Sequence, residues 1–120
     1  MNYTKQTVNG EQKNILANTH FTAISKKVAK SIASSGVIKA GTVINADGTV
    51  LANGTLTASI TKPVLGIVPY EINVSNEAGT NVVIPVLTHG TIIEEKAKEL
   101  SGGVAYSADV KAKLPLILFV

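Results

Sequence analysis

The segment that decides the fold is Asn81-Val82-Val83-Ile84-Pro85-Val86-Leu87, which contains no charged residue. Successive side chains of a strand point to opposite faces, and here both alternating sets, one starting at Val82 and one at Val83, are apolar. Such a segment is typical of a strand that is buried on both faces. We therefore expect it to belong to a closed barrel with further structure packed outside.

Apolar segments separated by turn residues continue on both sides of this strand, at residues 37–44, 63–70 and 114–120. The pairs Asp47-Gly48 and Asn53-Gly54 tolerate the positive φ of tight turns, so two small hairpins are expected within residues 42–56. The four prolines each remove a donor from a strand ladder, which places them at strand ends, edges or bulges. The sequence therefore predicts a mainly β fold, a small β-barrel or β-sandwich-like body with one or two short helices.

The length of 120 residues is typical of one compact domain with one hydrophobic core. Hydrophobic residues make up 45% of the chain but aromatic residues only 4%, so branched aliphatic side chains must fill that core. We expect residues 21–120 to form a single compact β-rich domain. Residues 114–120 are apolar without interruption and would invite aggregation if exposed, so we expect a paired core strand there, with Leu116 buried.

Residues 1–20 differ from the rest of the chain because they are rich in Asn, Thr, Gln and Lys. A segment that buries too little apolar surface to offset its ordering entropy stays mobile alone and often becomes ordered against a partner. We therefore predict a flexible N-terminal arm over residues 1–20. The start lacks the apolar core of a signal peptide, and no apolar run approaches the ~20 residues of a membrane span, so we expect a soluble protein made in the cytoplasm.

The segment that follows the arm has the apolar spacing of a helix. Phe21, Ile24, Val28 and Ile32 lie three or four residues apart, and Ser34-Ser35-Gly36 provides a stop. We prefer one amphipathic helix of about three turns over residues 21–32. The competing interpretation is an extended ribbon, in which one strand face would mix apolar and charged side chains: Ile24, Lys26, Val28, Lys30 and Ile32.

A second helix is predicted near residues 93–100, where Ile93, Ala97 and Leu100 share one helical face. Glu94 and Glu95 are adjacent in sequence and diverge by roughly 100° on a helix, so they cannot flank one sugar linkage or share a proton. They are better explained as charges in the first turn, facing the helix dipole.

The chain offers few residues for catalysis or metal binding. His20 and His89 are the only imidazoles, there is no Gly-x-Ser-x-Gly elbow, and neither histidine has a neighbour at metal-ligand spacing. Asn45-Ala46-Asp47-Gly48 has the start of a calcium loop but not its later bidentate Glu, so a hairpin turn is preferred. We predict no catalytic residue, no cofactor and no metal site, and therefore not an enzyme.

The charge of the chain narrows its possible partners. The net charge of +3 comes from eleven basic residues, all of them lysines, against eight acids. Without arginine the chain lacks the preferred bidentate ligand for phosphate and guanine, and it has few aromatic side chains to stack on bases, so nucleic acid is not an expected partner. Lys26, Lys27 and Lys30 are explained more simply by a solvated surface than by a phosphate site. No cysteine is present, which excludes disulfides and thiolate chemistry.

The order of strands and glycines resembles the lambda-type head decoration proteins of tailed phages. The likeness rests on residues 37–44, on Pro63-Val64-Leu65-Gly66-Ile67-Val68, on residues 82–87 with His89-Gly90-Thr91-Ile92, and on the final Leu-Pro-Leu-Ile strand. It covers most of residues 36–120 and is a pattern of strands rather than a catalytic signature. The resemblance implies a protein of the virion that sits on the outer capsid surface, commonly as trimers, and reinforces the shell.

The same resemblance implies that the N-terminal arm orders against the major capsid protein by adding backbone hydrogen bonds to its strands. The arm residues expected to bind the capsid are Asn2, Tyr3, Thr4, Lys5, Gln6, Thr7 and Val8. This sequence departs from the better-known members in its basic charge, in the lysines of residues 21–32 and in an arm with little proline or glycine.

A second hypothesis is a β-rich adhesion or carbohydrate-binding module of a phage fibre or cell surface. Lectin sites usually stack sugars on aromatic side chains, whereas Tyr3, Tyr70 and Tyr106 are scattered along this chain. A glycan array would test this hypothesis, and co-sedimentation with emptied capsids would test the first.

Overall fold

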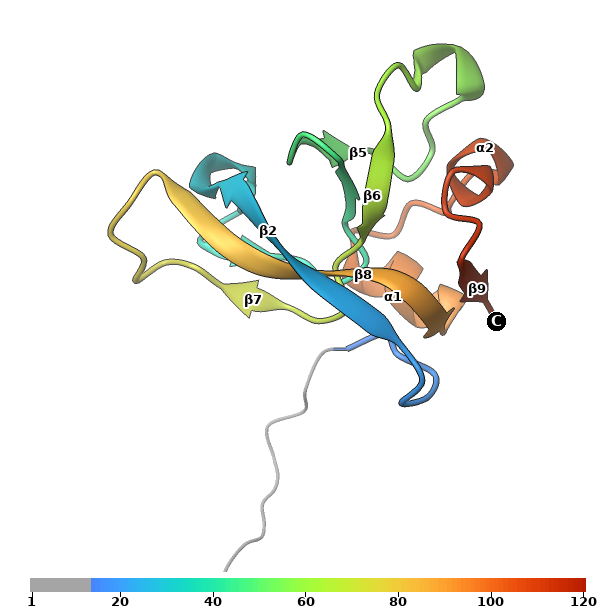
Figure 1. Ribbon diagram of the computed structural model, residues 1–120, viewed down its shortest axis with the longest axis horizontal. Coiled ribbons are helices and arrows are strands. Elements are labelled where there is room, and N and C mark those ends of the chain that lie inside the picture. The colour runs from blue at the N-terminus through green and yellow to red at the C-terminus, as the bar shows by residue number, and fades with distance from the viewer. Residues whose placement is uncertain (1–13) are drawn as a thin grey trace, which may run out of the picture.

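One long strand, β8 (Asn81–Ile92), organises the sheet in the computed structural model, which describes residues 14–120 (Figure 1). It pairs antiparallel with β2 (Thr22–Ala29) and β6 (Val64–Ile67), and parallel with β9 (Ile117–Phe119). The other described elements are the strands β3 (Val37–Ile38), β4 (Val43–Asn45), β5 (Val50–Leu51) and β7 (Ile72–Asn73), the helices α1 (Glu94–Leu100) and α2 (Ala108–Ala112), and the 3-10 turns Lys30–Ile32 and Thr57–Ser59.

The main sheet has the strand order β2-β8-β6-β4-β5, and β9 pairs with the far end of β8. A second, two-stranded sheet joins β3 to β7. The predicted mainly β fold with two short helices is confirmed. The sheet is not closed, because its path ends at β2 on one side and at the two-residue strand β5 on the other, so the expected closed barrel is not confirmed.

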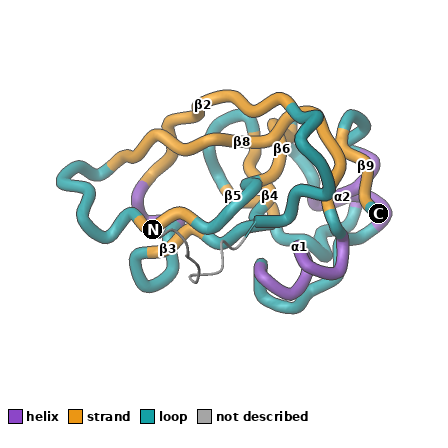
Figure 2. The backbone as a smooth tube through the Cα atoms, turned by 90° about the horizontal axis from the view of Figure 1, so that it is seen from below, coloured by secondary structure: helices purple, strands orange, loops and turns teal. Residues whose placement is uncertain are grey.

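The buried side chains form two clusters, and β8 contributes to both. Its first half supplies Val82, Ile84 and Val86 to the cluster beneath the β2–β8 ribbon. Its second half supplies Leu87 and Ile92 to the cluster that is packed against the two helices and β9. Figure 2 shows the long axis that this arrangement creates, with the β2–β8 ribbon reaching toward one end and β9 at the other.

The expectation that β8 is buried on both faces is wrong for its first half. Ile84 is 1% exposed, but its neighbour Val83, on the opposite face, is 66% exposed. Val83 lies across from Lys27 of β2. An apolar residue in an alternating position does not by itself require burial, since much of a protein surface is apolar.

The preferred helix over residues 21–32 is also wrong, and the competing extended interpretation is correct for Thr22–Ala29. β2 pairs with β8 along its whole length, from Thr22 opposite His89 to Ala29 opposite Asn81. Pairing with a distant strand overrides the weak local helical pattern here, because tertiary contacts outweigh propensity. The extended ribbon also explains why Val28 is buried while Lys26 on the same face is half-buried.

The body begins earlier than the predicted boundary at residue 21. Ile15 is fully buried, its N–H donates to the Pro69 carbonyl at 3.0 Å, and its carbonyl accepts from the Ile93 N–H at 2.8 Å. Ala17 donates to the Thr91 carbonyl at 2.9 Å. Residues 14–17 are therefore part of the packed body, and we call them the arm root. The predicted capsid-binding residues 2–8 lie outside the described residues.

The predicted helix near residues 93–100 is confirmed as α1. Of the two predicted hairpins, the first is confirmed, because β4 and β5 pair across the Asp47-Gly48 turn. The second is wrong, since Asn53-Gly54 leads into no partner strand. The buried Asn53 amide instead donates to Ser101 Oγ at 2.9 Å and to the Val104 carbonyl at 3.0 Å.

The C-terminal segment forms a paired strand, as expected, but only alternate side chains are buried. Ile117 is 5% exposed, whereas Leu116 is 62% exposed. The expected burial of Leu116 is therefore wrong: β9 lies at the rim of the molecule and buries a single face.

Two neighbouring residues of β8 test this burial pattern. Ile84→Asp should lower the free energy of unfolding by more than about 4 kcal/mol, because it places an unpaired charge in the cluster beneath the ribbon. The matched variant Val83→Asp should change it by less than about 1 kcal/mol, because that side chain faces solvent opposite Lys27. Urea unfolding followed by circular dichroism measures both, and equal effects would contradict the assigned faces.

Candidate functional site

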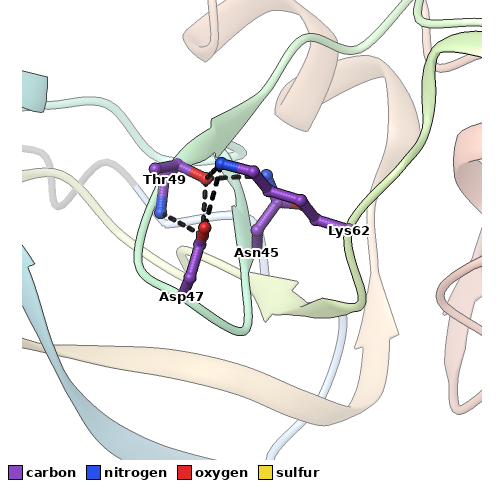
Figure 3. Close-up of polar contacts among 4 residues, drawn as sticks. All are labelled: Asn45, Asp47, Thr49 and Lys62. Carbon is purple, nitrogen blue, oxygen red and sulfur yellow. Dashed lines mark hydrogen bonds and ion pairs between the residues drawn. The ribbon is translucent and has the colours of Figure 1, made fainter.

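The turn between β4 and β5 holds a cluster of polar side chains, which Figure 3 shows in close-up. Gly48, with φ of +91°, donates its N–H to the Asn45 carbonyl at 2.9 Å, and the Asn45 N–H donates to the Thr49 carbonyl at 2.8 Å. A left-handed residue is needed at this position, which explains the glycine. The predicted hairpin turn is confirmed.

Asp47 is held by its neighbours in this turn. Its carboxylate accepts hydrogen bonds from Thr49 Oγ1 at 2.6 Å and from the Thr49 N–H at 3.0 Å, and it pairs with Lys62 Nζ at 2.9 Å. The hydrogen bond from the Thr49 hydroxyl, followed by the contact with Lys62, holds the pKa of Asp47 well below its usual range. The ammonium group of Lys62 therefore takes the position beside this carboxylate that a bound metal cation would need.

One buried atom of the cluster has no partner. The Thr49 hydroxyl gives its only hydrogen to Asp47, so toward Asn45 it can only accept, and the Asn45 Nδ2 donates to it at 3.0 Å. This orients the amide and leaves Asn45 Oδ1 without a hydrogen-bond partner among the described residues. Beside it lies a hollow of about 220 Å³, lined partly by the polar side chains Asn45, Thr49, Ser59, Thr61 and Lys62.

The sequence did not single out this hollow. The only local signal was the Asn45–Gly48 turn, and the residues of the opposite wall come from a separate loop more than ten positions later. The hollow can bind a small polar molecule by hydrogen bonds, because an amide oxygen accepts and hydroxyl groups both donate and accept.

The other residues considered from sequence are dispersed. His20 and His89 are exposed, the latter opposite Thr22 at the start of β2. Glu94 pairs with Lys111 at 2.7 Å, and Lys30 Nζ donates to the Glu77 carbonyl. No three His, Asp or Glu side chains gather to hold a metal within residues 14–120. Over the same residues, none of the helices has the length and apolarity needed to cross a membrane.

A buried tyrosine that the sequence did not identify closes the body near the helices. The Tyr106 hydroxyl donates to the Gly41 carbonyl at 2.5 Å, and burial raises the pKa of Tyr106 to about 12. Its ring lies 5.2 Å from that of Phe119, centroid to centroid. Tyr106 therefore ties the segment before α2 to the body and supports β9 from inside, which is a structural role.

The arm root is the second candidate site. It lies between the end of β8 and the Pro69–Tyr70 turn, with Asn14 bridged to Tyr70 and Leu16 bridged to Ile92. The side chain of Ile15 belongs to the larger of the two core clusters. The sequence showed the apolar pair Ile15-Leu16 but gave no sign that it enters the core.

Comparisons with known proteins add no relative. No protein-family model, no curated protein and no solved structure is significantly similar to this chain.

The low pKa of Asp47 leads to a pH prediction. A carboxyl with a depressed pKa in the folded state stabilises the fold above its unfolded value of 3.8, and this contribution is lost as the pH falls below that value. Asp47→Asn should therefore melt at a lower temperature than the parent at pH 7, and the difference should shrink at pH 2.5. Differential scanning calorimetry at both pH values measures it, and a difference independent of pH would contradict the assignment.

Proposed function

We propose that this protein decorates the outer surface of a tailed-phage head and stabilises the assembled shell. It acts by binding the major capsid protein and by self-association on the capsid, in trimers, and it catalyses no reaction. The resemblance of residues 36–120 to lambda-type head decoration proteins supports this proposal. The structural observation that supports it best is the arm root, because it fastens the predicted capsid-binding segment to the core.

A cement protein must carry load between itself and the shell. The root meets this need, since Ile15 is fully buried and is hydrogen-bonded on both sides, to Pro69 and to Ile93. Pulling on the preceding residues would have to extract a core side chain, which costs about 2–5 kcal/mol for an aliphatic residue. A root of this kind gives the arm a firm attachment.

The arm residues 2–8 suit pairing with an exposed strand of the shell. Strand addition gains main-chain hydrogen bonds with little demand on sequence, each contributing about 0.5–1.5 kcal/mol. Thr, Asn and Gln side chains fit a partly hydrated interface. Several arms of one oligomer raise one another's effective concentration at the capsid, so a weak single contact is sufficient.

Truncation at the arm root tests this function. The variant that starts at Asn14 should fold normally, because it keeps Ile15, and it should no longer co-sediment with DNA-free heads of the phage that encodes it. A variant that starts at Ala17 should instead be destabilised by about 2–5 kcal/mol, since it lacks Ile15. A scrambled sequence of residues 2–8 on the full chain is the matched control. Saturating binding by the chain that starts at Asn14 would refute the proposal.

The hollow beside Asn45 favours the second candidate, a carbohydrate-binding module. A sugar hydroxyl is a donor of the right size for the unpartnered Asn45 Oδ1, and the hydroxyl groups of Ser59 and Thr61 in the same lining can supply further hydrogen bonds. No aromatic side chain lines this hollow, so an affinity in the millimolar range is expected, about −4 kcal/mol.

An NMR titration tests this candidate. Monosaccharides added to the labelled full chain should shift the amide signals of Thr49 and Thr61. The variant Asn45→Asp should reduce these shifts, because it replaces the side-chain amide that the sugar would contact. The control Asn73→Asp changes an exposed asparagine of β7 and should leave the titration unchanged. Absence of shifts at 50 mM sugar, roughly fifty times a dissociation constant of about 1 mM, would exclude the candidate.

A further inference from the structure

The strand β9 has one open edge. It pairs in parallel with β8, with Gly90 opposite Ile117 and Ile92 opposite Phe119, and no other described strand pairs with it. The Gly90 N–H donates to the Leu116 carbonyl at 3.1 Å and the Val120 N–H donates to the Ile92 carbonyl at 3.0 Å. In this register the backbone of Leu118 faces β8, so the N–H and C=O of Phe119 face the open edge. An edge of this kind can accept a further strand.

The outward face beside this edge is apolar. Leu116, Leu118 and Val120 alternate along the strand and are 62%, 61% and 61% exposed. The intervening Ile117 and Phe119 point inward, where the Phe119 ring meets Tyr106. We call the three exposed side chains the β9 row. Figures 1 and 2 both place this strand at the rim of the molecule.

The size of the β9 row limits what can cover it. Three aliphatic side chains that are about three-fifths exposed present roughly 300 Å² of surface. A stable complex between two folded proteins buries about 800 Å² on each partner. The row is therefore too small to hold a second folded body by itself, and it matches a single added strand.

The arm root lies close to this edge. Leu16 is bridged to Ile92 on one side of β8, and Phe119 pairs with Ile92 on the other. Neighbouring strands are about 4.8 Å apart, so a strand added outside β9 lies roughly 14 Å from the root. Residues 9–13 span up to about 17 Å when extended, which is enough to cover this distance.

We propose that residues 3–8 of the arm dock in cis on the open edge of β9, as a strand parallel to it. The direction of the added strand follows from the root, which runs antiparallel to β8 and therefore also antiparallel to β9. The chain must reverse its direction once between the added strand and the root, so the added strand runs parallel to β9. Thr4, Thr7 and Val8 are β-branched, as strands prefer. In a strand, Tyr3 and Val8 point to opposite faces. Whichever face of the added strand covers the β9 row, one of these two apolar side chains therefore lies over the row.

Attachment in cis makes a small contact sufficient. A short linker gives the arm an effective concentration in the millimolar range, so the docked state needs little intrinsic affinity. Docking also shields an edge that would otherwise invite association between copies. Its consequence for capsid binding rests on the proposed function: the capsid competes for the same arm residues, and docking lowers the affinity for the shell.

Amide hydrogen exchange measured by NMR without capsid tests the docking. The Phe119 amide should exchange about tenfold more slowly in the full chain than in the chain that starts at Asn14, because it faces the added strand. The Leu118 amide, which faces β8, should exchange equally in both and is the internal control. Equal exchange of Phe119 in the two chains would overturn the proposal, whatever the capsid assay shows.

Concentration and a side-chain variant sharpen the test. Protection of Phe119 should not change between 20 µM and 1 mM protein, a roughly fiftyfold range of concentration, since docking in cis is unimolecular. Protection that rises with concentration would instead assign the edge to the arm of a second copy and would refute docking in cis. Leu118→Asp on the full chain should abolish the protection of Phe119, whereas Val83→Asp, an exposed aliphatic position outside the β9 row, should leave it unchanged.

Discussion

The structure depends on the backbone pairing of β8, because this strand alone joins elements from both ends of the described chain. Along its length it pairs with β2, meets β6 at Leu87, and then receives β9 on one side and the arm root on the other. Its side chains also connect the two core clusters. Close approach is required where the strands cross: a Cβ on Gly66 of β6 would lie 2.1 Å from the Leu87 carbonyl oxygen, so only glycine fits.

This dependence explains which parts of the fold the sequence could predict. The mainly β class, α1 and the β4–β5 hairpin follow from local signals: apolar segments, the spacing of Ala97 and Leu100, and the Asp47-Gly48 turn. The failures involve distant partners. The sequence of β2 resembled a helix because its apolar residues fit the period of a helix as well as that of a strand. Only its pairing with β8 determines that the segment is extended. Ile15 looked like part of an arm because the residues that bury it and pair with it lie far away in the sequence.

The candidate sites were less predictable than the fold. The unpartnered oxygen of Asn45 depends on how Thr49 shares one hydrogen with Asp47, a detail that no pattern of residue types encodes. The β9 row was visible as an apolar segment, but its exposure was not. Burial of alternate side chains depends on whether a second layer covers the strand, and here the layer with Tyr106 covers one face only.

The two strands that flank β8, β2 and β9, differ in the side chains beside their free edges. β2 carries Lys26 and Lys27, and charges of this kind discourage a further strand because pairing would crowd and desolvate them. β9 has no charged residue, and its exposed side chains are aliphatic. Selection against aggregation would remove such an edge unless something covers it. An arm whose root pairs with the other side of β8 can provide this cover and can still be released to a stronger partner.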